Sequence, residues 1–355
     1  MKGVVLCAGE GTRMRPLTYS QPKHLVPIAN RPVIEWILDT ISSAGISDIA
    51  MVVSPGTESA FREALGDGQS LGVNLSYVVQ EQAKGLAHAV HCAERFVAGE
   101  PFLLYLGDNL FERGVGGLID VYTERDCAAA ISLAQVEDPR RFGVACLEAG
   151  RITRLIEKPE NPPSDLAVAG AYIFEASIFD CIRRIQPSAR GELEITDAIQ
   201  LLVKDGKRAV LPHRVEGWWE DVGRPHDMLL ANELLLRRLT ASLRNESKGP
   251  SGSEGTVLID PSAKVERSKI IGPGVLGSGT RVKDAVIGPN VAVGKKCVLE
   301  DCRVEHSILM DGASVRGLEY VGFSILGYRA AVTKAIGGSG TALLLGNDSS
   351  VRIQR

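Results

Sequence analysis

The sequence predicts an α/β domain followed by a short left-handed β-helix. Three observations predict this division: strand-like and helix-like segments alternate over residues 1–243, residues 244–256 are rich in glycine and serine, and residues 257–355 repeat an aliphatic position about every six residues. A chain of 355 residues is long enough for about two domains of roughly 150 residues. We therefore expect an α/β domain, a linker and a β-helix domain with an irregular C-terminus.

Apolar stretches in the first part predict strands that alternate with helices. We expect strands at residues 2–7, 48–54, 74–79, 102–106, 128–135 and 168–174. We expect helices at residues 32–43, 58–65, 86–96 and 224–243. Pro32 suits a first helical turn and Gly45 suits a helix end. Such alternation predicts βαβ units on a mostly parallel, Rossmann-like sheet, in which ligands bind at the carboxyl ends of the strands.

The last hundred residues show a different period. Aliphatic residues recur about every six positions, with one step short by a residue, at Ile259, Val265, Ile271, Leu276, Val282, Ile287, Val293 and Leu299. This is typical of a hexapeptide β-helix, in which each turn stacks its aliphatic corner on the next, although a β-meander is the alternative. The pattern predicts roughly three to four turns. It weakens after Val315, and residues 337–341 predict a loose C-terminus.

Composition narrows the class of protein. The chain is 45% hydrophobic and 23% charged, which is typical of a soluble globular protein. A net charge of −3 provides no general attraction to nucleic acid or to an anionic membrane. No apolar stretch reaches the ~20 residues that span a bilayer, and no signal peptide is evident. The seven scattered cysteines fit no standard zinc site and predict buried free thiols in a reducing cytoplasm.

The first predicted strand leads into a loop of glycine and basic residues. Ala8, Gly9 and Gly11 are followed by Thr12, Arg13 and later Lys23. Glycines let backbone N–H groups turn toward an anion, and the cations can neutralise it. The spacing matches neither of the two common phosphate loops. We therefore expect a phosphate-binding loop of another type, with a plain strand-to-turn connection as the alternative.

Two carboxylates occupy positions suited to a divalent metal. Asp108 directly follows an apolar strand in the string LYLGDN, and Asp221 lies in WWEDVG. Carboxylates at the carboxyl end of a buried strand are well placed to bind magnesium, whereas a turn aspartate that caps the next segment is the structural alternative. Glu220 competes with Asp221, and the residues alone leave that choice open.

Three further blocks carry polar side chains that could bind a substrate. Gln80 ends a strand and Gly85 opens the next helix, and a glutamine amide can both donate to and accept from a pyrimidine edge. Glu157 can accept hydroxyl hydrogen bonds, its neighbour Lys158 can pair with an anion, and Arg190 can hold a phosphate with two hydrogen bonds. A surface ion pair and an acidic helix start are the structural alternatives.

The order of these blocks resembles the sugar-1-phosphate nucleotidylyltransferases. Residues 1–240 resemble glucose-1-phosphate thymidylyltransferases, the block PSARGELEITD at 187–197 is particularly specific to that group, and the repeat resembles the longer members. The resemblance implies a mixed, mostly parallel sheet. It also implies a Mg²⁺-dependent reaction in which glucose 1-phosphate attacks the α-phosphorus of dTTP in line, giving dTDP-glucose and pyrophosphate.

The resemblance also implies a role for individual residues. It implies catalytic roles for Arg13, Lys23 and Asp108, and favours Asp221 with Asp108 as the metal ligands. The implied nucleotide-binding residues are Ala8, Gly9, Gly11, Thr12, Arg13, Gln80 and Gly85. The implied sugar-phosphate residues are Gly143, Glu157, Lys158, Val168 and Arg190.

The sequence departs from this family at two positions of the loop. Many relatives have two adjacent glycines where this chain has Ala8-Gly9, and His24 stands where glutamine is frequent. Neither change removes a charge, so they bear on base and sugar preference rather than on activity. A UTP-dependent or other sugar-1-phosphate nucleotidylyltransferase is the near alternative, because thymine and uracil differ by one methyl group.

Two more distant alternatives belong to other classes. A hexapeptide acyltransferase would have His306 as the only histidine in its repeat, and a sugar-nucleotide-sensing regulatory subunit would not catalyse. Because no implied site residue lies beyond Asp221, we expect the β-helix to serve assembly or regulation in a homo-oligomer. A chain truncated near Lys248 is then expected to keep activity.

Overall fold

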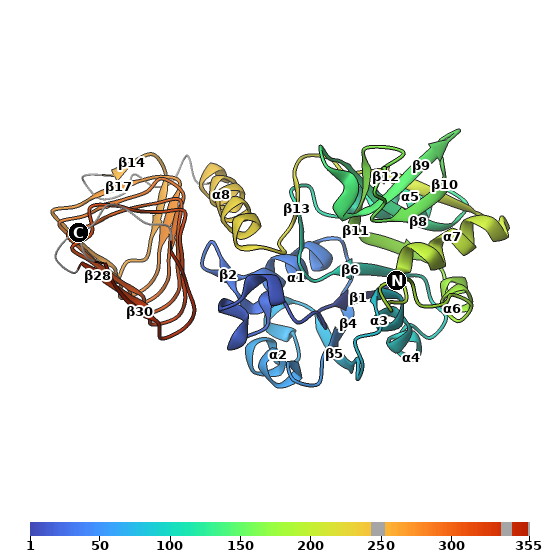
Figure 1. Ribbon diagram of the computed structural model, residues 1–355, viewed down its shortest axis with the longest axis horizontal. Helices are drawn as coiled ribbons and strands as arrows, with labels where there is room; N and C mark the ends of the chain where they lie inside the picture. Colours follow the sequence, from blue (N-terminus) through green and yellow to red (C-terminus); the bar gives the residue numbers. More distant parts are fainter. Residues whose placement is uncertain (243–252, 335–342, 354–355) are drawn as a thin grey trace. The chain divides into compact units, whose positions relative to one another are not determined.

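The computed structural model describes residues 1–242, 253–334 and 343–353 (Figure 1). Contacts group the chain into two compact units. The first consists of Met1–Gly9 and Ile34–Asp221, and the second of Glu10–Val33 and Val222–Arg355. Most of the predicted linker and residues 337–341 lie outside the described residues, so the proposed domain boundaries stay predictions.

The first unit contains the mixed sheet that was expected. Its strand order is β10-β9-β11-β6-β1-β4-β5, with β8 on β11 and β12 on β8. The strands β1, β4, β5 and β6 pair in parallel, whereas β11 is antiparallel to β6, β8 and β9. The bounds are β1 Lys2–Leu6, β4 Asp48–Val53, β5 Asn74–Val79, β6 Phe102–Leu106, β8 Cys127–Gln135, β9 Gly143–Glu148, β10 Arg151–Glu157, β11 Leu166–Phe174 and β12 Ala209–Arg214. The predicted fold class is confirmed.

Helices pack against this sheet (Figure 1). They are α1 Val33–Ser43, α2 Glu58–Leu65, α3 Leu86–Cys92, α4 Glu94–Val97, α5 Gly116–Glu124, α6 Ser177–Ile182 and α7 Ile195–Asp205. The single helix predicted at residues 86–96 is broken at Ala93, where the backbone has φ −87° and ψ 0°. Pro32 is not in the first helical turn but pairs with Pro27 in a hairpin. Phe102 lies in the core with its ring centroid 5.9 Å from that of Phe174 and 5.5 Å from that of Phe179.

The second unit begins with the loop segment Glu10–Val33. It contains three short 3₁₀ turns and a small hairpin. These are Thr12–Met14, Leu17–Tyr19, Lys23–Leu25 and the strands β2 Pro27–Ile28 and β3 Arg31–Pro32. The predicted terminal helix of the α/β part is α8, Pro225–Ser242, and belongs to the same unit. The loop segment is therefore grouped with α8 and the β-helix rather than with the sheet from which it emerges.

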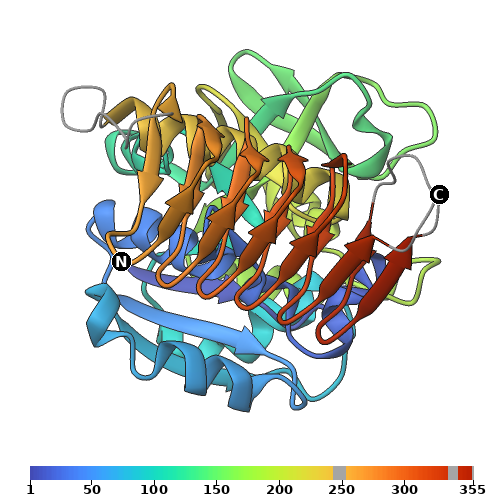
Figure 2. The ribbon, with the colours of Figure 1, turned by 90° about the vertical axis from the view of Figure 1, so that its left-hand side faces the viewer.

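Figure 2 shows the β-helix as a stack of parallel strands. Within the described residues its three sheets have five, six and six strands. The first is β14 Ser253–Glu254, β17 Lys269–Ile271, β20 Val286–Ile287, β23 Arg303–Glu305 and β26 Val321–Gly322. The second is β15 Val257–Ile259, β18 Gly274–Leu276, β21 Val291–Val293, β24 Ile308–Leu309, β27 Ile325–Leu326 and β29 Leu344–Leu345. The third is β16 Lys264–Glu266, β19 Arg281–Lys283, β22 Val298–Glu300, β25 Ser314–Arg316, β28 Ala331–Lys334 and β30 Ser350–Ile353.

The repeat is confirmed, but the predicted extent of three to four turns is wrong. Stacked residues are mostly 17 positions apart, as Val265 and Val282 are, and in one coil 16 apart, as Leu299 and Val315 are, so these coils are one or two residues shorter than three hexads. Pairing continues to β30, and the last register joins Ala331 to Ser350, 19 positions apart. This longer step breaks the hexad spacing, although buried Leu326 and Val332 still fill the interior.

The cysteines agree only partly with the expectation that all of them are free and buried. All seven cysteines lie in the described residues and none forms a disulfide, but Cys92 and Cys146 are partly exposed rather than buried. In the described part of the chain, every helix is too short or too polar to cross a bilayer.

Candidate active site

A two-stranded ribbon in the first unit brings the predicted metal ligands together. Asp108 lies between β6 and β7, which spans Asn109–Phe111. Strand β7 pairs antiparallel with β13, Trp219–Asp221, and this register sets Asn109 directly opposite Asp221. Two carboxylates that are far apart in the sequence are thus neighbours at the end of a central strand.

The same register distinguishes Asp221 from Glu220. Successive side chains of a strand point to opposite faces, so Trp219 and Asp221 share one face. The indole Nε1 of Trp219 donates to Asn109 Oδ1 at 2.7 Å, which identifies this face as the one that carries Asn109. Glu220 stands opposite Leu110 on the other face. Asp221 is therefore the carboxylate on the side of Asn109.

Asn109 itself was missed by the sequence analysis. It is 2% exposed, and its Nδ2 donates to Asp108 Oδ1 at 2.8 Å. Its Oδ1 accepts from Trp219 and from the backbone N–H of Gly170, the latter at 3.2 Å. Asn109 thus holds the Asp108 carboxylate through one hydrogen bond, and is itself held by the ribbon and by the sheet through two others. The string Gly107-Asp108-Asn109 contained the residue, but its partners lie far along the chain.

We expect Asn109→Ala to lower the free energy of unfolding by about 2–4 kcal/mol, because the buried N–H of Gly170 and the partly buried indole N–H of Trp219 lose their acceptor. Chemical denaturation measures the effect. Asn74→Ala is the matched control: Asn74 Nδ2 donates to Asp48 Oδ1 at 2.9 Å in an exposed pair, and its loss should cost about 0.5 kcal/mol or less. Equal losses for the two variants would contradict the buried role of Asn109.

The chemistry of the ribbon fits a magnesium ion. Mg²⁺ prefers oxygen ligands, retains several waters, and is commonly held by one or two protein carboxylates together with substrate phosphates. Asp108 and Asp221 supply two carboxylates. Among the described residues, no group of three or more His, Cys, Asp or Glu side chains could hold a metal by itself. The remaining ligands of a bound Mg²⁺ would be water and substrate oxygens.

The predicted base-binding residues lie together at the end of β5. Gln80 follows this strand and is 6% exposed. Its Nε2 lies 3.3 Å from the carbonyl oxygen of Gly85 and 3.0 Å from Nδ1 of His88. Burial, followed by the charge of Lys84, lowers the pKa of His88. The neutral ring can accept from the Gln80 amide, so His88, which was not predicted, orients that amide.

Gly85 occupies a position that only glycine fits. Its φ is +101°, and a Cβ there would lie 2.6 Å from the backbone oxygen of Leu193. The Leu193 N–H donates to Lys84 O at 2.8 Å, and the Ala87 N–H donates to Leu193 O at 3.0 Å. These bonds attach the segment before α7 to the segment before α3. Two blocks that were separate in the sequence are thereby joined.

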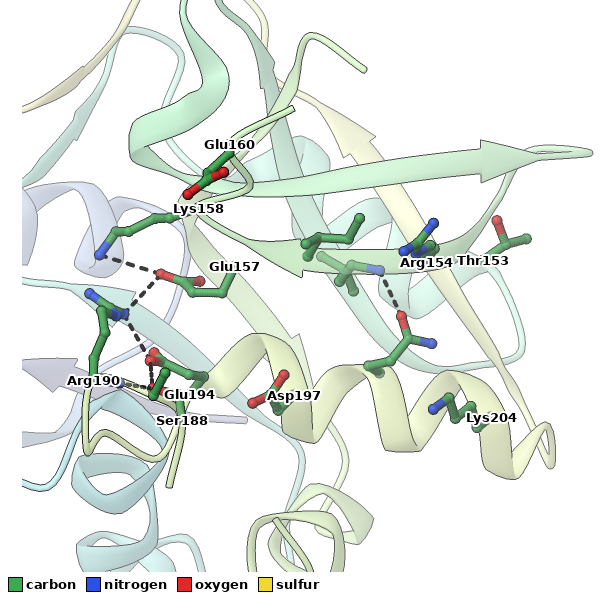
Figure 3. Close-up of a pocket in the computed structure, with 14 residues that line it drawn as sticks. Thr153, Arg154, Glu157, Lys158, Glu160, Ser188, Arg190, Glu194, Asp197 and Lys204 are labelled. Carbon is green, nitrogen blue, oxygen red and sulfur yellow. Dashed lines mark hydrogen bonds and ion pairs between the residues drawn. The ribbon is translucent and has the colours of Figure 1, made fainter. Parts of the chain in front are cut away.

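Three of the five predicted sugar-phosphate residues, Glu157, Lys158 and Arg190, line a cleft of about 930 Å³ between β10 and α7 (Figure 3). Glu157 Oε1 lies 3.4 Å from Lys158 Nζ and 3.3 Å from Arg190 Nη2. Arg190 also contacts Glu194 Oε1 at 2.8 Å and Glu192 Oε2 at 3.4 Å. Arg190 lies in a turn before α7 rather than in the helix. Its side chain is 41% exposed and can still meet an anion in the cleft.

The other two predicted residues, Gly143 and Val168, do not line this cleft, although Gly143 pairs with Glu157 between β9 and β10. A Cβ on Gly143 would lie 3.5 Å from both Glu157 Oε2 and Val168 Cγ2, and only 2.8 Å from the Thr196 methyl group. Thr196 Oγ1 donates to Glu157 Oε2 at 3.1 Å. Thr196 and Glu194 lie in the quoted block at 187–197, but only the structure shows that they hold Glu157 and Arg190.

Charge and burial couple these groups. Burial opposes the charge of Arg190, but the neighbouring Glu194, Glu192 and Glu157 hold its pKa above the usual value. Burial raises the pKa of Asp197, and Glu194 adds to the shift. Burial also raises the pKa of Tyr172, with further contributions from Glu157 and Asp108.

The predicted phosphate loop is compact within the second unit. Gly11 has φ +64°, and a Cβ there would lie 3.1 Å from both Lys23 Cβ and Thr18 Cγ2. Thr18 Oγ1 donates to the Gly11 carbonyl at 2.8 Å. Arg13 lies against Gly223, since a Cβ on that glycine would be 3.0 Å from Arg13 Nη2. Gly11, Arg13 and Lys23 are therefore gathered, and Arg13 approaches a residue two positions after Asp221.

The remaining loop residues precede or join this turn. Thr12 is exposed on the same 3₁₀ turn as Arg13. Ala8 is half-buried and Gly9 is exposed, and both belong to the first unit. They connect β1 to the loop along the chain, as the sequence predicted.

Comparison with known proteins gives matches over most of the chain. The family model described as "Nucleotidyl transferase" matches residues 2–238. A low-salt glycan biosynthesis nucleotidyltransferase of Haloferax volcanii is 38% identical over 358 residues, which covers 99% of this chain and 100% of that protein. A glucose-1-phosphate thymidylyltransferase of Streptomyces griseus is 40% identical over 336 residues, 94% of each chain. A solved structure of UDP-glucose pyrophosphorylase complexed with UDP-glucose has a TM-score of 0.60 at 27% identity and covers 67% of this chain and 98% of that chain.

Proposed function

This chain belongs to the nucleotidyl transferase family, and we propose that it transfers a thymidylyl group from dTTP to glucose 1-phosphate. The observation that carries the proposal is the pairing of the carboxylates Asp108 and Asp221 through Asn109, in the same unit as a cleft that contains Glu157, Lys158 and Arg190. The thymidylyltransferase of Streptomyces griseus supports the choice of nucleotide and sugar.

In the proposed reaction a phosphate oxygen of glucose 1-phosphate forms a bond to the α-phosphorus of dTTP. The bond from that phosphorus to the bridging oxygen breaks, and pyrophosphate leaves with the electron pair. Both partners are anionic, so catalysis consists mainly of positioning and charge neutralisation. A bound Mg²⁺ would neutralise phosphate charge at Asp108 and Asp221.

Each group of side chains has a distinct part in this reaction. Lys158 and Arg190 would hold the sugar phosphate, and Glu157 would accept hydrogen bonds from sugar hydroxyls. Arg13 and Lys23 would bind the triphosphate and neutralise the charge that develops on the leaving pyrophosphate. Because the Gln80 amide nitrogen is engaged by Gly85 and His88, its oxygen is the atom that would accept the N3–H of the pyrimidine.

A uridylyltransferase is the second candidate. Gln80 would bind the N3–H edge, which is common to thymine and uracil. The structural similarity to a UDP-glucose pyrophosphorylase favours this second candidate. A pocket that senses one methyl group discriminates by about 10- to 200-fold at most. We therefore expect dTTP to be preferred over UTP by a factor within that range.

Pyrophosphate release tests both candidates. The full-length protein is incubated with four nucleoside triphosphates against a panel of sugar 1-phosphates, with and without Mg²⁺. We expect the highest kcat/KM with dTTP and glucose 1-phosphate, and no turnover after chelation by EDTA. Faster turnover with UTP would establish the second candidate, and absence of pyrophosphate release in every combination would refute both.

A further inference from the structure

The hairpin that ends the loop segment Glu10–Val33 is attached to α8 and to the β-helix within the second unit. Its tip consists of Ala29 and Asn30, which have φ +49° and +62°. The Ala29 N–H donates to Asn232 Oδ1 of α8 at 2.9 Å. Asn30 Nδ2 donates to the carbonyl oxygen of Val293, the last residue of β21, at 2.5 Å.

Asn232 connects three elements with one side chain. It is 1% exposed, so its polar atoms depend on protein partners. While Oδ1 accepts from Ala29, Nδ2 donates to the carbonyl oxygen of Asn290, at 3.3 Å, immediately before β21. The loop, α8 and the β-helix therefore share a single buried amide.

Further contacts continue along the same sheet of the β-helix. Gln21 Nε2 lies 4.0 Å from the sulfur of Met310, which follows β24. Asn347 Nδ2 donates to Ser20 Oγ at 2.8 Å, just beyond β29. A Cβ on Gly346 would lie 3.4 Å from Pro16. The loop thus contacts residues at the ends of strands β21, β24 and β29, which belong to one sheet.

We propose that the β-helix is the platform that positions the phosphate-binding loop, with Asn30 and Asn232 as positioning residues for Lys23 and Arg13. This inference rests on the proposed function, which assigns the triphosphate to those two cations. Lys23 lies between the attached positions Ser20 and Asn30, and Arg13 lies three residues before Pro16. The loop has only short 3₁₀ turns and a two-residue-per-strand hairpin of its own, so the external contacts fix its path.

This role differs from the assembly role expected from the sequence. Displacement of a catalytic group by about 1 Å can cost 100-fold in rate, so a cation on an irregular loop needs a rigid support. The stacked coils of the β-helix provide one, since their interior is filled by buried aliphatic side chains. We accordingly expect activity to depend on the β-helix surface that contacts the loop. The sequence alone had instead led us to expect that a chain truncated near Lys248 keeps its activity.

Two variants of the full-length chain test the proposal. Asn30→Gly removes the bond to Val293 and retains a backbone that glycine readily adopts at positive φ. Asn232→Leu removes both bonds of the shared amide at nearly constant volume. The matched control is Ser324→Ala: Ser324 is 0% exposed and makes two hydrogen bonds to backbone, to Gly322 O at 2.8 Å and from Leu343 N at 2.9 Å, both inside the β-helix.

The readouts are the KM for dTTP, the KM for glucose 1-phosphate, and amide hydrogen exchange over residues 11–26. We expect Asn232→Leu to raise the KM for dTTP by about five- to thirtyfold and to leave the KM for glucose 1-phosphate unchanged. Asn30→Gly should act in the same direction with a smaller change. Exchange over residues 11–26 should accelerate in both variants. Ser324→Ala should change neither the KM values nor this exchange.

The outcomes separate this inference from the proposed function. An active parent enzyme whose KM for dTTP and loop exchange are unchanged in both variants would overturn the platform role. An equal rise of both KM values, shared by Ser324→Ala, would overturn it as well, because that result reflects general destabilisation. A parent protein without pyrophosphate release would refute the proposed function, and the exchange experiment would still decide whether the β-helix holds the loop.

Discussion

Asp221→Asn is expected to lower kcat by about 10²- to 10³-fold while the protein stays folded, and Asp108→Asn should do the same. Asp108 is held by Asn109, which lies opposite Asp221, and each substitution removes one negative charge from the group that would hold Mg²⁺. Such a loss amounts to several kcal/mol of transition-state stabilisation. Pyrophosphate release as a function of Mg²⁺ concentration measures it, and Mn²⁺ is expected to restore part of the rate.

Glu220→Gln is the matched control for this prediction. It removes the neighbouring carboxylate, which stands opposite Leu110 on the other face of β13. Its kcat should stay within a few-fold of the parent value. A loss at Glu220 as large as that expected at Asp221 would transfer the metal ligand to Glu220 and would contradict the face assigned from the register.

Local pattern was sufficient to predict the strands and helices whose burial follows a regular period. Strands β5 and β6 have the predicted bounds, because they are bounded by clear changes between apolar and polar residues. The hairpin β2–β3 was not predicted, since its tip, Ala29-Asn30, lacks the glycine that marks most tight turns. Its conformation is supported instead by Asn232, 203 positions away.

The candidate site also contains features that depend on partners far along the chain and could not be predicted from local pattern. Sequence order predicted Asp108 and Glu157 as site residues, because acids at the ends of apolar strands are recognisable in one chain. It could not choose between Glu220 and Asp221, because the choice depends on which residue of β13 opposes Asn109. His88 and Asn109 were missed for a related reason. Each orients another side chain through a hydrogen bond, and such a bond cannot be recognised from the spacing of residues in the sequence.

Arg13→Ala and Lys23→Ala are expected to lower kcat/KM for dTTP by about 10²- to 10³-fold, with a fall in kcat as well as a rise in KM. Negative charge builds on the leaving pyrophosphate, so a cation that contacts it is worth more in the transition state than in the ground state. Lys23 packs against Gly11 within the loop, and Arg13 packs against Gly223 outside it. Steady-state kinetics at saturating glucose 1-phosphate separates the two parameters.

Arg183→Ala supplies the control, because it removes an equal charge from the surface. Arg183 is paired there with Glu94 at 2.8 Å and with Asp180 at 2.5 Å, and exposed pairs of this kind contribute about 0–1 kcal/mol. Its kinetics should therefore match the parent enzyme. If Arg13→Ala and Lys23→Ala raise KM without lowering kcat, the two cations only dock the nucleotide, and the stabilisation of the leaving group must come from Mg²⁺ and from the groups around Asp108 and Asp221.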